Sequence, residues 1–141
     1  MHNHTPALRR LIACLPFLMA ASAIHAATFQ AESAALSGGA ATATDHSGYT
    51  GSGFVGGFVD GNKGNAQTSF TVNAATAGNY TLKLRYANGT GSAKTLTLYV
   101  DGVSKGQVSR CYTANWDDWL VKTTTVALTA GNHSIAYKFT S

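Results

Sequence analysis

The chain has 141 residues, and its ten Lys and Arg residues against six Asp and Glu give a formal net charge of +4 at pH 7. Arg9 and Arg10 belong to a leader segment, and the remaining basic residues form no cluster. A nucleic-acid-binding protein needs such a cluster to neutralise phosphates, so this class is excluded.

The first 26 residues have the order of a secretory signal peptide. Arg9 and Arg10 form a short basic region, the apolar run 11–24 follows, and "IHA" ends at Ala26 with a small residue. The run is too short for a membrane helix, which needs about 20 apolar residues. We expect a signal peptide at 1–26 that is removed, a secreted, extracellular protein without membrane attachment, and one mature domain at 27–141.

The mature domain begins with "FQAES", in which Gln30 and Glu32 are two positions apart. On a strand their side chains project to one face and offer two oxygens to one cation. Calcium takes about six to eight oxygen ligands, with carbonyls and carboxylates mixed. From the spacing alone, an exposed strand with a solvated Glu32 is the favoured interpretation.

The segment "GSGFVGG" contains a literal G-x-G-x-x-G at Gly51, Gly53 and Gly56. A dinucleotide fingerprint needs a helix after these glycines, whereas Phe54 and Val55 are typical of a strand. The glycines are therefore interpreted as positions of close backbone packing.

From residue 68 onward apolar and polar residues alternate, which predicts strands with one buried and one wet face. The runs are "TSFTV" (68–72), "NYTLKLRY" (79–86), "TLTLYV" (95–100) and "SIAYKF" (134–139). Turn residues such as the Asp and Gly of "DGVSKG" separate them. Since no mature segment has helical spacing, the predicted fold class is all-β, a β-sandwich of the jelly-roll type.

No pair of side chains is suited to catalysis. Asp117 and Asp118 are adjacent, so on an extended chain they point to opposite sides and cannot act together across a glycosidic bond. Cys111 has no partner once Cys14 leaves with the signal peptide, and it is interpreted as a small buried apolar residue. We expect no catalytic residue and no enzyme activity.

Both tryptophans of the chain lie in "NWDDW", at positions 116 and 119. On an extended segment residues three apart face opposite ways, so one can be buried while the other is exposed. Trp119 begins an apolar run and is predicted to be the core residue. Trp116 follows "TAN" and is predicted to be exposed, where an aromatic face suits the C–H face of a sugar ring. The alternative, that both fill the core, remains open on the spacing alone.

Six segments in order carry a resemblance to a known family: "FQAESAALSGGA", "GYTGSGFVGGF", "AGNYTLKLRYANG", "LTLYVDG", "NWDDW" and "VALTAGNHSIAYKF". Together they resemble the carbohydrate-binding modules of family 35 and, more distantly, family 6. The resemblance implies a calcium-stabilised jelly roll that binds a polysaccharide or oligosaccharide and performs no chemistry. Such modules are usually appended to secreted glycoside hydrolases, lyases or esterases, which they target to the glycan.

The resemblance also implies roles for individual residues. Gln30 and Glu32 match the family's calcium-ligand pair, which reverses the interpretation favoured by spacing. Trp116, Tyr49 and Asn88 match positions at the carbohydrate-binding loops, and Trp119 falls where the family has a packing residue.

The sequence departs from the family pattern at its end. It stops at "KFTS", before a closing strand that carries a further calcium ligand and a sugar-binding Asn in the family, so the module at 27–141 is expected to be C-terminally incomplete. We expect a monomer that can associate through an uncovered edge near Ile135, Tyr137 and Phe139. Two alternatives stay open: the first part of a glycoside hydrolase or polysaccharide lyase, and a cell-surface adhesion sandwich without a glycan site.

Overall fold

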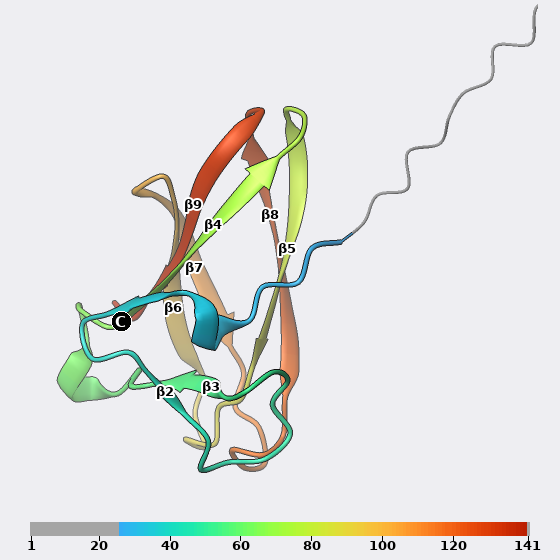
Figure 1. Ribbon diagram of the computed structural model, residues 1–141. Coiled ribbons are helices and arrows are strands. Elements are labelled where there is room, and N and C mark those ends of the chain that lie inside the picture. Colours follow the sequence, from blue (N-terminus) through green and yellow to red (C-terminus); the bar gives the residue numbers. More distant parts are fainter. Residues whose placement is uncertain (1–25, 141) are drawn as a thin grey trace, which may run out of the picture.

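The computed structural model describes residues 26–140, most of which form antiparallel strands (Figure 1). The elements are η1 Ala31–Ser33, β1 Ala35–Ser37, β2 Ala41–Ala43, β3 Phe54–Gly56, η2 Asp60–Asn62, β4 Gln67–Ala74, β5 Gly78–Tyr86, β6 Lys94–Val100, β7 Val103–Arg110, β8 Leu120–Leu128 and β9 Gly131–Lys138. The fold class is the all-β jelly-roll sandwich predicted from the alternating pattern. The expected signal peptide lies outside the described residues except for Ala26.

The strands form two layers. One is a five-stranded sheet in the order β1-β4-β9-β6-β7, and the other contains the β5–β8 pair, with the β2–β3 hairpin at one end (Figure 1). All strand pairs are antiparallel. Within residues 26–140, no helix is long and apolar enough to cross a bilayer.

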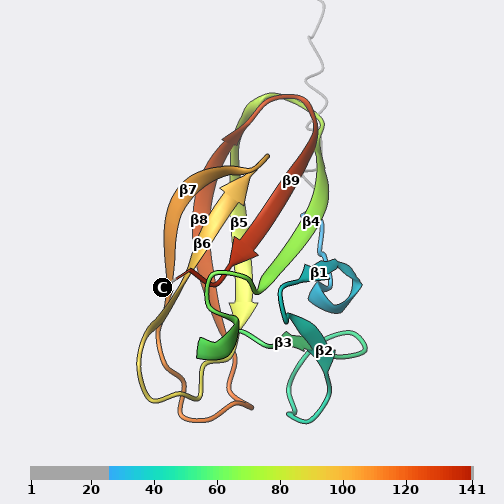
Figure 2. The same cartoon turned by 90° about the vertical axis from the view of Figure 1, so that its left-hand side faces the viewer.

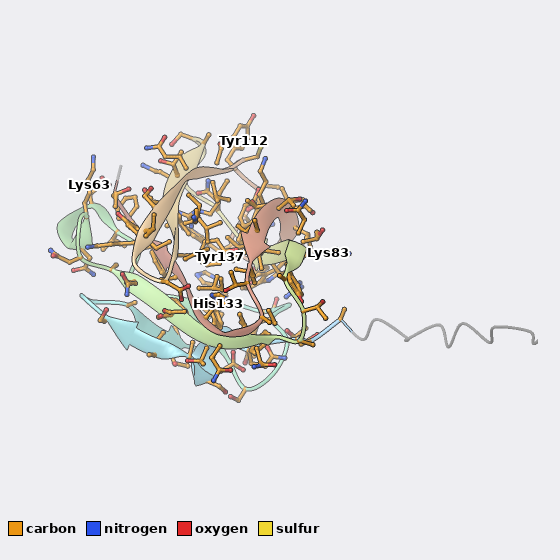
Figure 3. The ribbon with its side chains drawn as sticks, turned by 90° about the horizontal axis from the view of Figure 1, so that it is seen from above. Lys63, Lys83, Tyr112, His133 and Tyr137 are labelled. Atoms are coloured by element: carbon orange, nitrogen blue, oxygen red, sulfur yellow. The ribbon has the colours of Figure 1, made fainter. Side chains whose placement is uncertain are left out.

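The core lies between the layers and is built from the inward residues of β6, β8 and β9. Leu98 is 1% exposed and Phe139 is 2% exposed. Viewed from above, Tyr137 lies inside the sandwich, whereas Lys63, Lys83 and Tyr112 lie at its periphery (Figure 3). The predicted period-two pattern therefore selects the buried side chains of the central strands.

The turn between β6 and β7 shows how local sequence sets the register. Asp101 and Gly102 have φ values of 51° and 78°, and they join Val100 to Val103 in a two-residue hairpin. Positive φ at both positions is what a type I′ turn requires, and Asp-Gly is a preferred pair there. Asp101 is fixed further by the backbone N–H of Ser134, which donates to its Oδ1 at 2.8 Å.

The expectation that the strand around residue 137 would lie at an uncovered edge is wrong. β9 is a central strand, paired with both β4 and β6, and Ile135, Tyr137 and Phe139 are 3%, 6% and 2% exposed. The row of apolar side chains that is only partly buried is on β5 instead. Among the described strands, β5 pairs only with β8.

Two further expectations fail locally. Cys111 is exposed, because it follows β7 on a loop and does not belong to the alternating strand pattern. Gln30 and Glu32 do not lie on a strand: Gln30 is the N-cap residue of η1, and Glu32 is within that 3-10 turn. The glycine-rich segment is followed by the strand β3 and not by a helix, which agrees with the exclusion of a dinucleotide fingerprint.

Candidate functional site

Three loops meet at one end of the sandwich and carry His46, Tyr49, Tyr112 and both tryptophans. They are the β2–β3 loop (44–53), the β5–β6 loop (87–93) and the β7–β8 loop (111–119), all at the lower end in Figures 1 and 2. Rigid strands fix the ends of each loop, so side chains that are distant in sequence can be held in one place.

The β5–β6 and β7–β8 loops are joined by Asn88 and Thr113. The Thr113 N–H donates to the Asn88 carbonyl at 2.8 Å, and the Asn88 N–H donates to Thr113 Oγ1 at 3.1 Å. The Asn88 side-chain amide donates to the carbonyls of Ser92 (2.9 Å) and Arg110 (3.2 Å). Asn88 is 2% exposed, so the structure places it beneath the loops. This position favours a positioning role over the direct sugar contact that the resemblance implies.

The β7–β8 loop turns sharply at Trp116 and is not the extended segment assumed from the spacing. Asn115 Oδ1 accepts hydrogen bonds from the backbone N–H groups of Asp117 (2.7 Å) and Asp118 (3.1 Å). Asparagine supports turns in this way because its side chain bonds the backbone two residues on. The turn presents Trp116 outward, where it is 42% exposed, as the sequence predicts.

Gly89 and His46 hold the Trp116 ring. A Cβ atom at position 89 would lie 2.7 Å from Trp116 Cδ1, which is closer than real Cβ contacts allow, so a larger residue there would displace the indole from this position. The His46 ring stacks on Trp116 with centroids 6.0 Å apart and planes at 27°. The indole is therefore supported at a defined orientation.

Asp117 connects the turn to the β2–β3 loop. Its Oδ1 accepts a hydrogen bond from the Ser47 N–H at 2.6 Å and lies 3.7 Å from His46 Nδ1. The hydrogen bond from the Ser47 backbone is the main cause that lowers the Asp117 pKa, and the nearby His46 adds to it. His46 was not predicted as a site residue from the sequence. The one feature that could have indicated it is its position in the same loop as Tyr49.

Trp119 is not a core residue, so the prediction made for it is wrong. It is half-buried and lies outside the core cluster. Its Nε1 donates to the Ser47 carbonyl at 2.9 Å, its ring packs edge-on against Phe54 at 6.0 Å, and the Arg85 guanidinium lies 4.7 Å from its centroid. Arg85 also donates to the Gly48 carbonyl at 2.6 Å. Trp119 thus holds the β2–β3 loop in place.

Tyr49 lies in that loop with its ring 5.9 Å from Phe54, and it is half-buried. Tyr49, His46 and Trp116 line the same hollow. Asn88, which is 2% exposed, lines the same hollow, so the structure brings together all three residues that the resemblance assigns to the sugar and adds His46 to them.

The expected metal ligands converge on the β2–β3 loop. Gln30 Oε1 accepts a hydrogen bond from Thr50 Oγ1 at 3.2 Å, and Glu32 Oε1 accepts one from the Ser52 N–H at 2.9 Å. Gly51, with φ of 78°, lies against both oxygens, so a side chain there would overlap with Glu32. Hydrogen bonds from the backbone N–H groups, that of Glu32 first, lower the pKa of this carboxyl.

These oxygens are of the type that calcium prefers, but they fill only part of its shell. Within residues 26–140 no group of three or more His, Cys, Asp or Glu side chains could hold a metal ion. The donor set fits a hard cation held by one carboxylate, one amide oxygen and neighbouring hydroxyls.

Comparison with known proteins gives consistent matches. The model of the carbohydrate binding module (family 35) matches residues 27–139. A 1,6-alpha-glucosyltransferase of Sporosarcina globispora is 41% identical over 85% of this chain but 10% of its own length.

Two solved structures are also similar. The family 35 carbohydrate binding module from Clostridium thermocellum superposes with a TM-score of 0.74 at 30% identity, covering 80% of this chain and 85% of that one. A Paenibacillus sp. cycloisomaltooligosaccharide glucanotransferase complexed with cycloisomaltoheptaose has a TM-score of 0.74 at 38% identity, over 79% of this chain and 16% of that one.

The chain thus spans about a tenth of the length of the glucosyltransferase that it matches. The family model covers nearly all of the described residues. The jelly-roll fold and the loop cluster agree with this match. The chain belongs to family 35 of the carbohydrate-binding modules.

Proposed function

We propose that the loop end of the sandwich binds carbohydrate without chemical turnover, with Trp116 as the platform for a sugar ring. The observation that carries this proposal is the 42% exposed indole, held at the tip of a turn by Gly89 and His46. An exposed tryptophan with this much support suits recognition, because little side-chain entropy is lost when a ligand binds.

The expected energetics are modest. Stacking a sugar on Trp116 buries roughly 50–100 Å² of apolar surface, which contributes about 1–2.5 kcal/mol. Tyr49 lines the same hollow as Trp116, and the exposed Asp118 is two residues from Trp116 in the chain, so we expect both to offer hydrogen bonds to hydroxyl groups. We expect dissociation constants in the micromolar to millimolar range, which corresponds to about −8 to −4 kcal/mol.

The ligand class we propose is an α-glucan with 1,6 linkages. Support comes from the relatives: one is a 1,6-alpha-glucosyltransferase, and another was solved with cycloisomaltoheptaose. The module would target an associated glycan-active enzyme, and export by the signal peptide at 1–26 would place it outside the cell, where such polysaccharides occur.

Calcium is proposed as a structural ligand of Gln30 and Glu32. When bound it would neutralise the Glu32 carboxylate and fix η1 against the β2–β3 loop that carries Tyr49. Binding is expected to be weak, because only one of the described side chains that meet there carries a formal charge.

The test is a titration panel by isothermal calorimetry with cycloisomaltoheptaose, linear isomaltooligosaccharides, xylooligosaccharides and galacturonic oligosaccharides. We expect binding to the isomalto ligands and no release of reducing sugar during long incubation. Binding to xylan or uronic ligands alone would contradict the ligand class, and no binding to any glycan would contradict the proposed function.

A further inference from the structure

Three places in the chain join an aspartyl or asparaginyl residue to a following glycine: Asp60–Gly61, Asn88–Gly89 and Asp101–Gly102. In such a pair the glycine nitrogen can attack the side-chain carbonyl carbon, because no Cβ atom shields it and glycine adopts a wide range of backbone conformations. The reaction needs a side chain that is free to swing toward this nitrogen. The structure distinguishes the three pairs by that freedom.

In two of the pairs the side chain is held. Asn88 is 2% exposed, and its side-chain amide donates to the Ser92 carbonyl at 2.9 Å. Asp101 Oδ1 accepts a hydrogen bond from the Ser134 N–H at 2.8 Å, and its Oδ2 lies 2.7 Å from His133 Nδ1. Such hydrogen bonds must break before either side chain can react, and each one slows the reaction by roughly tenfold.

Asp60 has no such restraint. It is the first residue of the short helix η2 at the surface of the molecule (Figure 1, green), and both Asp60 and Gly61 are exposed. Within residues 26–140, no group forms a hydrogen bond or ion pair with the Asp60 carboxylate. The Gly61 N–H likewise has no acceptor in this part of the chain, as is usual for the first turn of a helix. Both reacting groups are therefore free.

The space around Gly61 is open. Apart from its chain neighbours, no heavy atom lies within 4 Å of a Cβ atom built at this position, and its φ is not positive. The segment therefore has room to close a ring. An alanine also fits there without strain, although its Cβ atom shields the nitrogen, so Gly61→Ala is a matched variant for the reaction.

We propose that Asp60–Gly61 is a site of spontaneous covalent modification, at which the folded protein converts aspartate to isoaspartate through a cyclic imide. The Gly61 nitrogen forms a bond to Asp60 Cγ, and one carboxyl oxygen leaves as water with the proton of the nitrogen and the proton of the carboxyl group. Water then opens the imide. Opening at Cγ restores aspartate, whereas opening at the main-chain carbonyl carbon leaves the chain linked through Cγ. Solvent water is the co-reactant, and the mass of the protein is unchanged.

Isoaspartate lengthens the main chain of η2 by one carbon atom. The extra atom lies inside the ring that is closed by the hydrogen bond from the Asn62 N–H to the Val59 carbonyl (2.8 Å). Asn62 Nδ2 donates to the Gly57 carbonyl at 2.9 Å, and the same side chain fills the space over Gly39, where a larger residue would overlap with it. Because Gly39 and Gly57 flank the β2–β3 hairpin, the modification should loosen its open end.

The test follows labelled oxygen. The whole protein is kept at pH 6 and 37 °C in water enriched in oxygen-18 and is then digested in ordinary water. Electron-transfer fragmentation locates both the label and the isoaspartate, since each opening of the imide adds one labelled oxygen. We expect both at position 60 at least about tenfold faster than at position 101 in the same sample. Gly61→Ala should slow the reaction at position 60 by at least about tenfold without lowering the Tm.

Asp60→Asn gives a comparison with Asn88–Gly89 inside one molecule, because both pairs then react with ammonia as the leaving group. We expect position 60 to lose ammonia at least about tenfold faster than position 88 in the folded protein, and the two rates to become similar in urea. Hydrogen exchange at the amides of β2 and β3 should be faster in the isoaspartate fraction than in the unmodified one. Trp116→Ala should leave the rate at position 60 unchanged, which separates this proposal from the carbohydrate site.

Three results would overturn the proposal. Equal labelling of positions 60 and 101 in the folded protein would show that the hydrogen bonds of Asp101 give no protection. A rate at position 60 more than about a hundredfold below that of the free peptide Val-Asp-Gly-Asn-Lys would show that η2 protects its own aspartate. A difference between positions 60 and 88 that persists in urea would assign the rates to the local sequence and not to the fold.

Discussion

β9 and β5 both carry alternating rows of apolar side chains, yet their surroundings differ. β9 has a strand on each side, and Ile135 and Phe139 are 3% and 2% exposed. β5 has a strand on one side, and Leu82 and Leu84 are only partly buried, toward a groove. The interior thus has a closed half, around β9, and an open half, around β5, although the two strands have the same alternating pattern. An alternating row identifies the inward face of a strand, but the number of its neighbours decides how far that face is buried.

The largest expected effect tests this difference directly. Leu98→Ala in the closed half should lower the free energy of unfolding by about 3–5 kcal/mol, because it leaves a cavity in a region that cannot relax. Leu82→Ala in the open half should lower it by only about 1 kcal/mol, since the side chain is only partly buried. Urea unfolding of both variants measures the difference between the two losses of unfolding free energy. Equal losses would show that the β5 side is as tightly packed as β9.

Trp119→Ala is expected to have an intermediate effect. The change removes one hydrogen bond to the Ser47 carbonyl and the contact with the Arg85 guanidinium, so stability should fall by about 1–2 kcal/mol. Arg85→Ala serves as the matched variant, since it removes the partner from the same ring. If chemical unfolding shows that Trp119→Ala loses more than about 3 kcal/mol of unfolding free energy, Trp119 behaves as a core residue and this account of it is wrong.

The closed half also contains a pH-dependent contact. His133 Nδ1 lies 2.7 Å from Asp101 Oδ2, and the Nε2 of its ring lies 2.9 Å from the Thr129 carbonyl. The hydrogen bond to Asp101 is the main cause that raises the His133 pKa, and it also lowers the Asp101 pKa. A raised folded-state pKa gives stability that is present below the unfolded value of about 6.5 and is lost as the pH rises through the folded value.

We therefore expect the Tm to fall as the pH is raised above about 6.5. Asp101→Asn should flatten this dependence while keeping the turn, because Asn-Gly also forms type I′ hairpins. The measurement is differential scanning fluorimetry from pH 5 to 9. An unchanged slope in Asp101→Asn would show that His133 does not gain its proton affinity from this contact.

Calcium should have the smallest effect on stability. A ligand that binds only the folded state stabilises it in proportion to its affinity, and the shell at Gln30 and Glu32 is incomplete within the described residues. We expect the Tm to rise slightly in millimolar calcium and the rise to vanish in Glu32→Gln. A strong shift with submillimolar calcium would mean that further ligands complete the shell.

Most of the long strands were predictable because their signal is local, but β7 was missed, since "DGVSKG" was interpreted as a turn although residues 103–106 begin that strand. "NYTLKLRY" alternates without a break, and it becomes β5 with Tyr80, Leu82 and Leu84 inward. The exposure of Trp116 was also predictable from its loop-like flanks. In contrast, the buried position of Asn88 depends on hydrogen bonds to the carbonyls of residues 92 and 110, and no local sequence pattern predicts these contacts.

The misplacement of Trp119 has a similar cause. On an extended chain, residues three positions apart, such as Trp116 and Trp119, face opposite ways. Asn115 bends this segment into a turn, so the rule for an extended chain does not apply to it. The partners of the ring, Arg85 and Ser47, come from another strand and another loop. Such contacts follow from the fold and cannot be deduced from spacing.

The central claim is that Trp116 contacts the sugar and Trp119 supports the loop. Because the chain has two tryptophans, single-tryptophan variants separate them by intrinsic fluorescence. In Trp119→Phe, added cycloisomaltoheptaose should change the emission of Trp116 with the wild-type affinity. In Trp116→Phe, the remaining Trp119 emission should change little and affinity should fall at least tenfold, whereas Tyr112→Ala, at a more exposed aromatic of the same loop, should bind normally. Full affinity in Trp116→Phe, with a ligand-dependent signal from Trp119, would contradict the account.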